Sequence, residues 1–156
     1  MLEEESAGAV SALHDLSATD LIAGFRARQF SPIEALDDVL AHIDVWEPHI
    51  KALYAFDPDG ARAAAKASTE RWQKGEPHGP LDGVPVTIKD NIATRGVAVP
   101  LGTATTKLVP AEADAPPAAR LREAGAIILS KTTMPDFGML SSGLSSFHPL
   151  DRKSVV

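Results

Sequence analysis

The chain has 156 residues, of which 44% are hydrophobic, and its formal net charge is -6 at pH 7. This length and composition suit one ordinary hydrophobic core, so we expect a single domain over residues 1–156 and exclude a disordered or collagen-like chain. The absence of cysteine excludes a disulfide framework, a thiolate nucleophile and a zinc–thiolate site. The acidic balance without a basic run argues against nucleic-acid binding.

No segment has the properties of a membrane anchor. The apolar run 124–129 is too short to cross a bilayer, and the acidic start at residues 2–5 does not fit a basic secretory leader. We therefore expect a cytoplasmic protein that has no contact with a membrane. Partners should be small molecules or other proteins.

Two helix starts are marked near the amino-terminal end. The order Ser-Ala-Thr-Asp from Ser17 is a capping pattern, and the order Ser-Pro-Ile-Glu from Ser31 adds proline at the first helical position. In the second helix, four apolar residues three and four positions apart form one stripe: Ile33, Leu36, Leu40 and Ile43. Such a stripe indicates packing against the core.

The next segment reads as strand, turn and helix. Residues 51–56 alternate weakly and predict a strand, and Asp-Pro-Asp-Gly at 57–60 predicts a turn. An alanine-rich helix should then run from Ala61 to about Lys74. Residues 75–83 are rich in glycine and proline and predict a loop.

After this loop, an apolar strand runs directly into Lys89. Because side chains of a strand alternate between its faces, Lys89 should share a face with Thr87, whereas Asp90 should point the other way. A desolvated lysine without a carboxylate partner loses its proton more readily and can act as a general base. A lysine at a strand end is more often a solvated cap, so the local pattern alone permits a base without identifying one.

The remaining elements complete an α/β pattern. Residues 95–111 predict an irregular stretch, because glycine and proline interrupt it. The proline pair that follows Asp114 predicts a short helix ending near Ala124, with Gly125 as its left-handed exit and a buried strand at 126–129. Alternating helices and strands favour an α/β fold with a largely parallel or mixed sheet.

Several blocks of this sequence recur together in a known pattern. The blocks are Leu-Asp-Gly-Val-Pro-Val-Thr-Ile-Lys-Asp-Asn at 81–91, Gly96, Gly102-Thr103, Asp114-Ala115, Leu-Arg-Glu-Ala-Gly-Ala-Ile-Ile-Leu at 121–129, Lys131-Thr132 and Met-Pro-Asp-Phe-Gly at 134–138. In this order and spacing they resemble the amidase signature family, the serine hydrolases with a Ser-Ser-Lys triad, and the resemblance runs from about residue 16 to 149. The resemblance implies the family's α/β/α architecture with a mixed sheet, present here as its amino-terminal part.

The resemblance also implies a reaction, the hydrolysis of a small-molecule carboxamide to a carboxylate and ammonia or an amine through an acyl-serine intermediate. In this pattern Lys89 is the general base. It takes a proton from a bridging serine that relays from the nucleophilic serine, while a glycine–serine loop binds the oxyanion. Lowering a lysine pKa from about 10.4 to about 7.5 takes roughly 4 kcal/mol, which burial can supply.

The match breaks at about Asp151, and residues 151–156 diverge from the family pattern. The family's glycine–serine loop and nucleophile belong further along, so we expect an incomplete, truncated amidase domain without either catalytic serine. The serines within 141–146 precede that place and lack paired glycines, so we interpret them as a polar loop. Uncovered strand edges should make such a part associate, which leaves a homo-oligomer open.

Other site residues are less sharply marked. Gly138 aligns with a substrate contact of the family and, without a side chain, could only shape the acyl pocket; a plain turn glycine is equally consistent. Thr133 and Asp136 stand where the family commonly has asparagine and glutamate, which leaves the substrate open. The histidines show no metal-ligand spacing, and no phosphate or dinucleotide loop is present, so we expect neither a metal nor a cofactor.

Two alternatives to a free-standing amidase remain. The first is an amidotransferase A-type subunit, which shares the lysine motif but releases ammonia from glutamine for a tRNA-linked acyl group within a complex. The second is a non-catalytic α/β fragment or interaction module.

Overall fold

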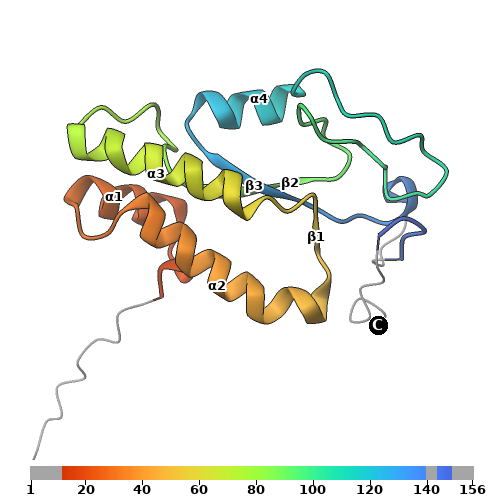
Figure 1. The fold of residues 1–156 in the computed structure, drawn as a ribbon, viewed down its shortest axis with the longest axis horizontal. Coiled ribbons are helices and arrows are strands. Elements are labelled where there is room, and N and C mark those ends of the chain that lie inside the picture. Colours follow the sequence, from red (N-terminus) through yellow and green to blue (C-terminus); the bar gives the residue numbers. More distant parts are fainter. Residues whose placement is uncertain (1–11, 140–143, 149–156) are drawn as a thin grey trace, which may run out of the picture.

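The computed structural model describes residues 12–139 and 144–148 (Figure 1). Its sheet has three strands in the order β1-β3-β2. Strand β1 (Leu53–Tyr54) runs antiparallel to β3 (Ile127–Thr132), and β2 (Pro85–Lys89) runs parallel to β3. The predicted α/β fold with a mixed sheet is therefore confirmed.

The helices flank this sheet. In the view of Figure 1, α4 lies on one side of the β2–β3 pair and α1 and α2 lie on the other, with α3 alongside α2. The helical elements are α1 (Ala18–Ala27), α2 (Pro32–Ile50), α3 (Pro58–Lys74), α4 (Pro116–Glu123) and the short 3-10 turns η1 (Leu13–Asp15) and η2 (Asp136–Gly138). Among the described residues, no helix has both the length and the apolar character that crossing a bilayer requires.

Both predicted helix starts at the amino-terminal end are confirmed. The Ser17 hydroxyl accepts the backbone N–H of Asp20 at the start of α1. At the start of α2, Ser31 and Glu34 form a complete capping box, in which each side chain accepts the other residue's backbone N–H. These bonds satisfy donors that a helix leaves unpaired at its first turn.

The third helix begins earlier than predicted. Residues 57–60 form no separate turn, because Asp57 is the N-cap of α3 and its carboxylate accepts the N–H of Gly60. Pro58 then stands at the first helical position, where its fixed φ angle and missing N–H cost nothing. The same residue types suit a turn and a helix start, which is why the prediction of a turn at 57–60 was wrong.

The apolar stripe of α2 forms the centre of the core. Leu36 and Leu40 are buried, and Ile33 and Ile43 pack against the same cluster. The cluster's other buried members come from α3 and β3: Ala61, Ala65, Ile127 and Leu129. Close packing at the alanines brings α3 against α2, as the stripe predicted.

Two of the strands differ in length from the prediction: β1 is shorter and β3 is longer. Strand β1 is shorter than residues 51–56, because the carboxylate of Glu47 accepts the N–H groups of Ala52 and Leu53, and Ala55 has a φ of 50°. Strand β3 continues beyond Leu129 to Thr132. Its polar residues tolerate burial there because their side chains find partners, as the Ser130 hydroxyl does at the carbonyl of Tyr54.

The segment before β2 is held by a buried carboxylate. Asp82 is fully buried and accepts hydrogen bonds from the Arg71 guanidinium, with Nε at 2.9 Å, and from the N–H of His78 at 2.8 Å. Burial by itself would raise the pKa of Asp82, but the hydrogen bonds from Arg71 and His78 outweigh it and hold the pKa below its ordinary value. The start of β2 is therefore tied to α3.

Gly125, which follows α4, packs against Asp82. Gly125 has a φ of 88°, as its predicted left-handed role requires, and a Cβ there would lie 2.8 Å from the Cα of Asp82. Gly75, which ends α3, has a similar φ of 75° but nothing within 4 Å of its missing Cβ. The two glycines thus share a left-handed backbone conformation, but only Gly125 is closely packed.

Replacing each of these glycines by alanine separates the two effects. We expect Gly75→Ala to cost about 1 kcal/mol of unfolding free energy, from the left-handed backbone alone. Gly125→Ala should cost about 3 kcal/mol, because the new methyl group meets backbone that cannot move cheaply. Urea unfolding measures both values, and equal losses at the two positions would contradict the close approach of Gly125 to Asp82.

Candidate functional site

Lys89 ends β2 with its side chain exposed. The residues on either side of it, Ile88 and Asp90, are buried, so Lys89 and Asp90 face opposite ways as the strand pattern predicted. Lys89 pairs with Thr132 of β3, which places its ammonium at the carboxyl end of the parallel pair. This is the edge at which α/β sheets commonly carry their sites. Burial of Lys89, which a neutral lysine would need, is not supplied by the described residues.

The backbone around Lys89 is fixed by three hydrogen bonds. The N–H of Asp90 donates to the carbonyl of Thr132 at 2.9 Å, and the N–H of Ile92 donates back to the carbonyl of Lys89 at 3.0 Å. The ammonium of Lys131 then donates to the carbonyl of Ile92 at 2.8 Å. These hydrogen bonds restrict the backbone that carries the exposed Lys89 side chain.

Behind Lys89, the Asp90 carboxylate collects three donors. The backbone N–H groups of Leu101 and Gly102 lie 2.9 Å and 3.0 Å from its two oxygens, and Nε2 of His148 is the third partner. Leu101 and Gly102 have φ angles of 55° and 68°, and two consecutive residues of this kind turn their N–H groups toward one point. A Cβ on Gly102 would collide with the carbonyl oxygen of Pro135, so only glycine fits there.

Lys131 is the buried lysine of this region, with 1% of its surface exposed. Burial lowers its pKa, and the negative charge of Asp90 opposes that change. The sequence pattern drew attention to Lys89 because of the apolar strand before it. The equally apolar strand before Lys131 buries that lysine instead.

The described serines of the last segment are engaged in internal hydrogen bonds. The Ser145 hydroxyl donates to the carbonyl of Gly102 and accepts the N–H of His148 at 2.9 Å. The Ser146 hydroxyl lies 2.9 Å from the Asp136 carboxylate, which also accepts the Ser146 N–H. The expected polar loop at 141–146 agrees with these two residues, while 141–143 lie outside the described residues.

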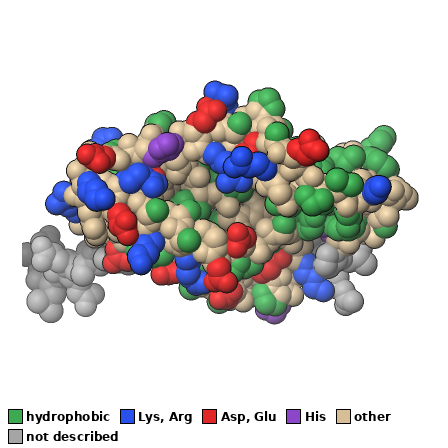
Figure 2. Space-filling view, turned by 45° about the horizontal axis from the view of Figure 1, so that its top comes forward, with side chains coloured by type: hydrophobic (Ala, Val, Ile, Leu, Met, Phe, Trp, Pro, Cys, Tyr) green, Lys and Arg blue, Asp and Glu red, His purple; other side chains and the backbone are tan. Residues whose placement is uncertain are grey.

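Gly138 ends η2 on the surface, with a φ of 67°. Its neighbours Phe137 and Met139 are exposed by 57% and 82%, which is unusual for large apolar side chains. Figure 2 shows hydrophobic side chains gathered at the right-hand end of the visible face. The turn at Gly138 therefore lies between two apolar groups that stand in solvent.

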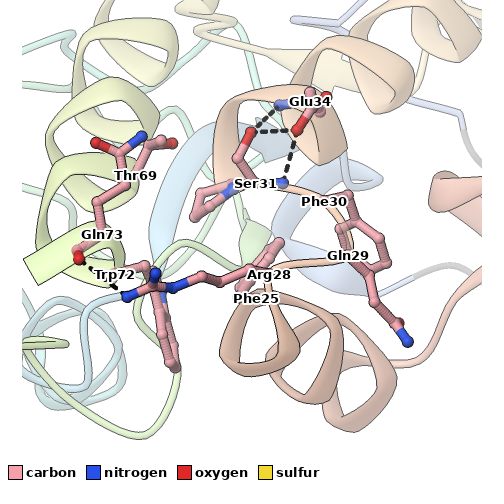
Figure 3. A pocket seen from close by; sticks show the side chains of 10 residues that line it. Phe25, Arg28, Gln29, Phe30, Ser31, Glu34, Thr69, Trp72 and Gln73 are labelled. Carbon is pink, nitrogen blue, oxygen red and sulfur yellow. Dashed lines mark hydrogen bonds between the residues drawn. The ribbon is translucent and has the colours of Figure 1, made fainter. Parts of the chain in front are cut away.

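One cavity of the described chain lies apart from Lys89. It has a volume of about 350 Å³ and lies between the α1–α2 connection and the end of α3 (Figure 3). Phe25, Phe30 and Trp72 supply apolar walls, and the guanidinium of Arg28 already donates to the carbonyl of Gln73 at 3.2 Å. None of the predicted site residues lines it. No group of three or more acidic, histidine or cysteine residues within the described chain is arranged to hold a metal ion.

The contact between Asp90 and His148 was missed by sequence reasoning. Fifty-eight positions separate the two residues, and neither belongs to a local pattern that points to the other. His148 packs its ring edge-on against Tyr54 at 5.2 Å and is 5% exposed. The carboxylate directly after the predicted base was visible in the sequence, but its burial and its partners were not.

Comparison with known proteins identifies the family of this chain. The sequence pattern of the Amidase family matches residues 34–151, so the chain belongs to the amidase signature family. Two curated relatives are A-type subunits of glutamyl-tRNA(Gln) amidotransferase. The one from Chloroflexus aurantiacus is 37% identical over 138 residues, and the one from Halorhodospira halophila is 36% identical over 135 residues. These matches cover 88% and 86% of this chain and 28% of each relative, so the chain spans about a quarter of their length.

Solved structures give the same family. A bacterial aryl acylamidase of the amidase signature family is 26% identical, with a TM-score of 0.76 over 85% of this chain and 28% of that one. The peptide amidase of Stenotrophomonas maltophilia is 27% identical, with a TM-score of 0.72 over 84% of this chain and 27% of that one. Fatty acid amide hydrolase, at 20% identity and a TM-score of 0.84 over 90% of this chain and 25% of that one, supports the fold alone.

The buried state of Lys131 predicts a pH dependence of stability. Because its folded pKa lies below the ordinary 10.5, the unfolded chain binds more protons in the window between the two values. The unfolding free energy should therefore rise with pH in that window, relative to Lys131→Met. Urea unfolding from neutral pH to 10.5 measures the difference. Lys89→Met is the exposed control, and a flat difference for Lys131→Met would contradict its desolvation.

Proposed function

We propose that Lys89 is the general base of an amidase centre in the whole protein, which hydrolyses a carboxamide to a carboxylate and ammonia or an amine. The observation that carries this proposal is the position of Lys89. Its ammonium stands free at the carboxyl end of a parallel strand pair, while its backbone is fixed by Asp90, Ile92 and Thr132. A base must be held close to one geometry to act efficiently.

The proposed chemistry needs two serines in addition to Lys89. A bridging serine would pass the nucleophile's proton to the lysine, and backbone N–H groups would stabilise the oxyanion of the tetrahedral intermediate. Ser145 and Ser146 do not suit these roles, because their hydroxyls bond to Gly102 and Asp136. We assign the serines to segments of the whole protein outside the described residues, and those segments would also cover Lys89 and exclude water from it.

We propose a small-molecule linear amide as the substrate, with the turn at Gly138 as one border of the acyl pocket. The exposed side chains of Phe137 and Met139 favour an apolar acyl group. The cytoplasm is the proposed compartment, since the chain has no cysteine that an oxidising compartment would pair.

A second candidate is glutamine-dependent ammonia release in an amidotransferase complex. It is favoured by the two curated relatives, which are A-type subunits of glutamyl-tRNA(Gln) amidotransferase at 36% and 37% identity. The lysine chemistry would be the same. The acyl group would be the polar side chain of glutamine, and the ammonia would pass to a partner's substrate.

The role of Lys89 predicts a loss of turnover without a loss of fold. In the whole protein, Lys89→Ala should lower kcat for amide hydrolysis by about a thousandfold or more, because no other group takes the proton. Lys89→Arg should not restore activity, since a guanidinium stays protonated. Lys66→Ala, an exposed lysine in α3, is the matched control. Ammonia release measures turnover, and activity of Lys89→Ala within about tenfold of wild type would remove the assignment.

Substrate competition separates the two enzymatic candidates. An amidase with an apolar acyl pocket should hydrolyse an aryl or long-chain amide with a kcat/KM at least about tenfold above that for glutamine. Glutaminase activity that rises when partner subunits are added would favour the amidotransferase. A fluorophosphonate probe tests the remaining alternative, because a protein without an activated serine stays unlabelled. Absence of labelling in the whole protein would favour a non-catalytic module.

A further inference from the structure

A buried polar cluster lies on the face of β2 opposite Lys89. Its three charged or titratable members are Asp90, Lys131 and His148, which are 0%, 1% and 5% exposed. They come from three segments: the end of β2, strand β3 and the last described loop. Buried groups of this kind cost folding free energy unless each has partners, and all three of these groups have them.

The direction of each hydrogen bond follows from the acceptor. The carboxylate oxygens of Asp90 accept the N–H groups of Leu101 and Gly102, and Nε2 of His148 donates to the same carboxylate in the tautomer that carries its proton on that nitrogen. Lys131 supplies the nearby positive charge through its ammonium, which also holds the carbonyl of Ile92. Asp90 thus has three donors fixed by backbone or packing.

The cluster joins the end of β2 to the loop that follows it and to the last described segment. The bonds to Leu101 and Gly102 hold the loop after β2, and the bond to His148 holds the segment 144–148. The Ser145 hydroxyl adds a second link between these two segments through the carbonyl of Gly102. Any movement of Asp90 would therefore move both loops together with the strand end that carries Lys89.

We propose that Asp90 and His148 are positioning residues for Lys89. The pair fixes the backbone of the strand end from behind and clamps the two loops against it, so that the ammonium keeps one place relative to the substrate. This inference rests on the proposed function of Lys89 as the base. A displacement of the order of 1 Å at a reacting group costs about a hundredfold in rate, which is enough for a residue that never touches substrate to control kcat.

The test compares two replacements of His148 in the whole protein. The amide of His148→Gln can still donate to the Asp90 carboxylate, whereas His148→Leu fills the space without a donor. We expect kcat for amide hydrolysis within about threefold of wild type for His148→Gln and at least about tenfold lower for His148→Leu, with KM changed by less than about twofold in both. His78→Leu, at an exposed histidine, is the matched control.

Asp90→Asn completes a double-mutant cycle. The asparagine amide turns a donor toward groups that are themselves donors, so kcat should fall about as far as in His148→Leu. The kcat of the double variant should be little lower than that of the less active single variant, because Asp90→Asn and His148→Leu remove the same contact. Additive losses, or an unchanged kcat in folded His148→Leu, would overturn the positioning role.

Hydrogen exchange supplies a readout that does not depend on turnover. Backbone exchange at 101–103 and at 145–148 should speed up together in His148→Leu and stay near wild type in His148→Gln. Unchanged exchange at either segment in His148→Leu would contradict the proposal that Asp90 and His148 hold the two loops together. If the wild-type protein hydrolyses no carboxamide but exchange still responds to His148→Leu, the clamp stands and the failure lies in the role proposed for Lys89.

Discussion

The buried carboxylate of Asp90 is the constraint on which the site region depends. A fully buried negative charge has to be matched by fixed donors, and here they come from a left-handed backbone turn at Leu101 and Gly102 and from His148. The turn and the last segment both supply donors to this one carboxylate. Removing the carboxylate would leave these buried donors without their acceptor.

Strand β2 is held by buried carboxylates beyond both of its ends. Before the strand, Asp82 binds the Arg71 guanidinium and the N–H of His78; after it, Asp90 binds the loops. Between them lies a short strand, in which Ile88 is deeply buried and Lys89 is exposed. A short strand fixed at both ends can present one side chain to solvent with little backbone motion, even though it lies at the edge of the described sheet.

Sequence reasoning succeeded where the physical cause is local. A serine cap with an acidic residue three positions later acts within one helical turn, and α1 and α2 begin where this signal stands. It failed where two local readings share residue types, as at Asp57, and where the cause is distant. The burial of Lys131 rather than Lys89 and the contact of Asp90 with His148 depend on which segments meet in space, and no periodicity encodes that meeting.

A lysine base has two requirements, and the described chain treats them differently. Its position depends on the backbone, and hydrogen bonds at Lys89, Asp90 and Ile92 already fix it. Its neutrality depends on desolvation, and the exposed ammonium of Lys89 has none from the described residues. Position is therefore built into this part of the fold, whereas basicity is conditional on whatever covers the carboxyl end of β2. Such a division would make the proposed activity depend on the complete site closing over Lys89.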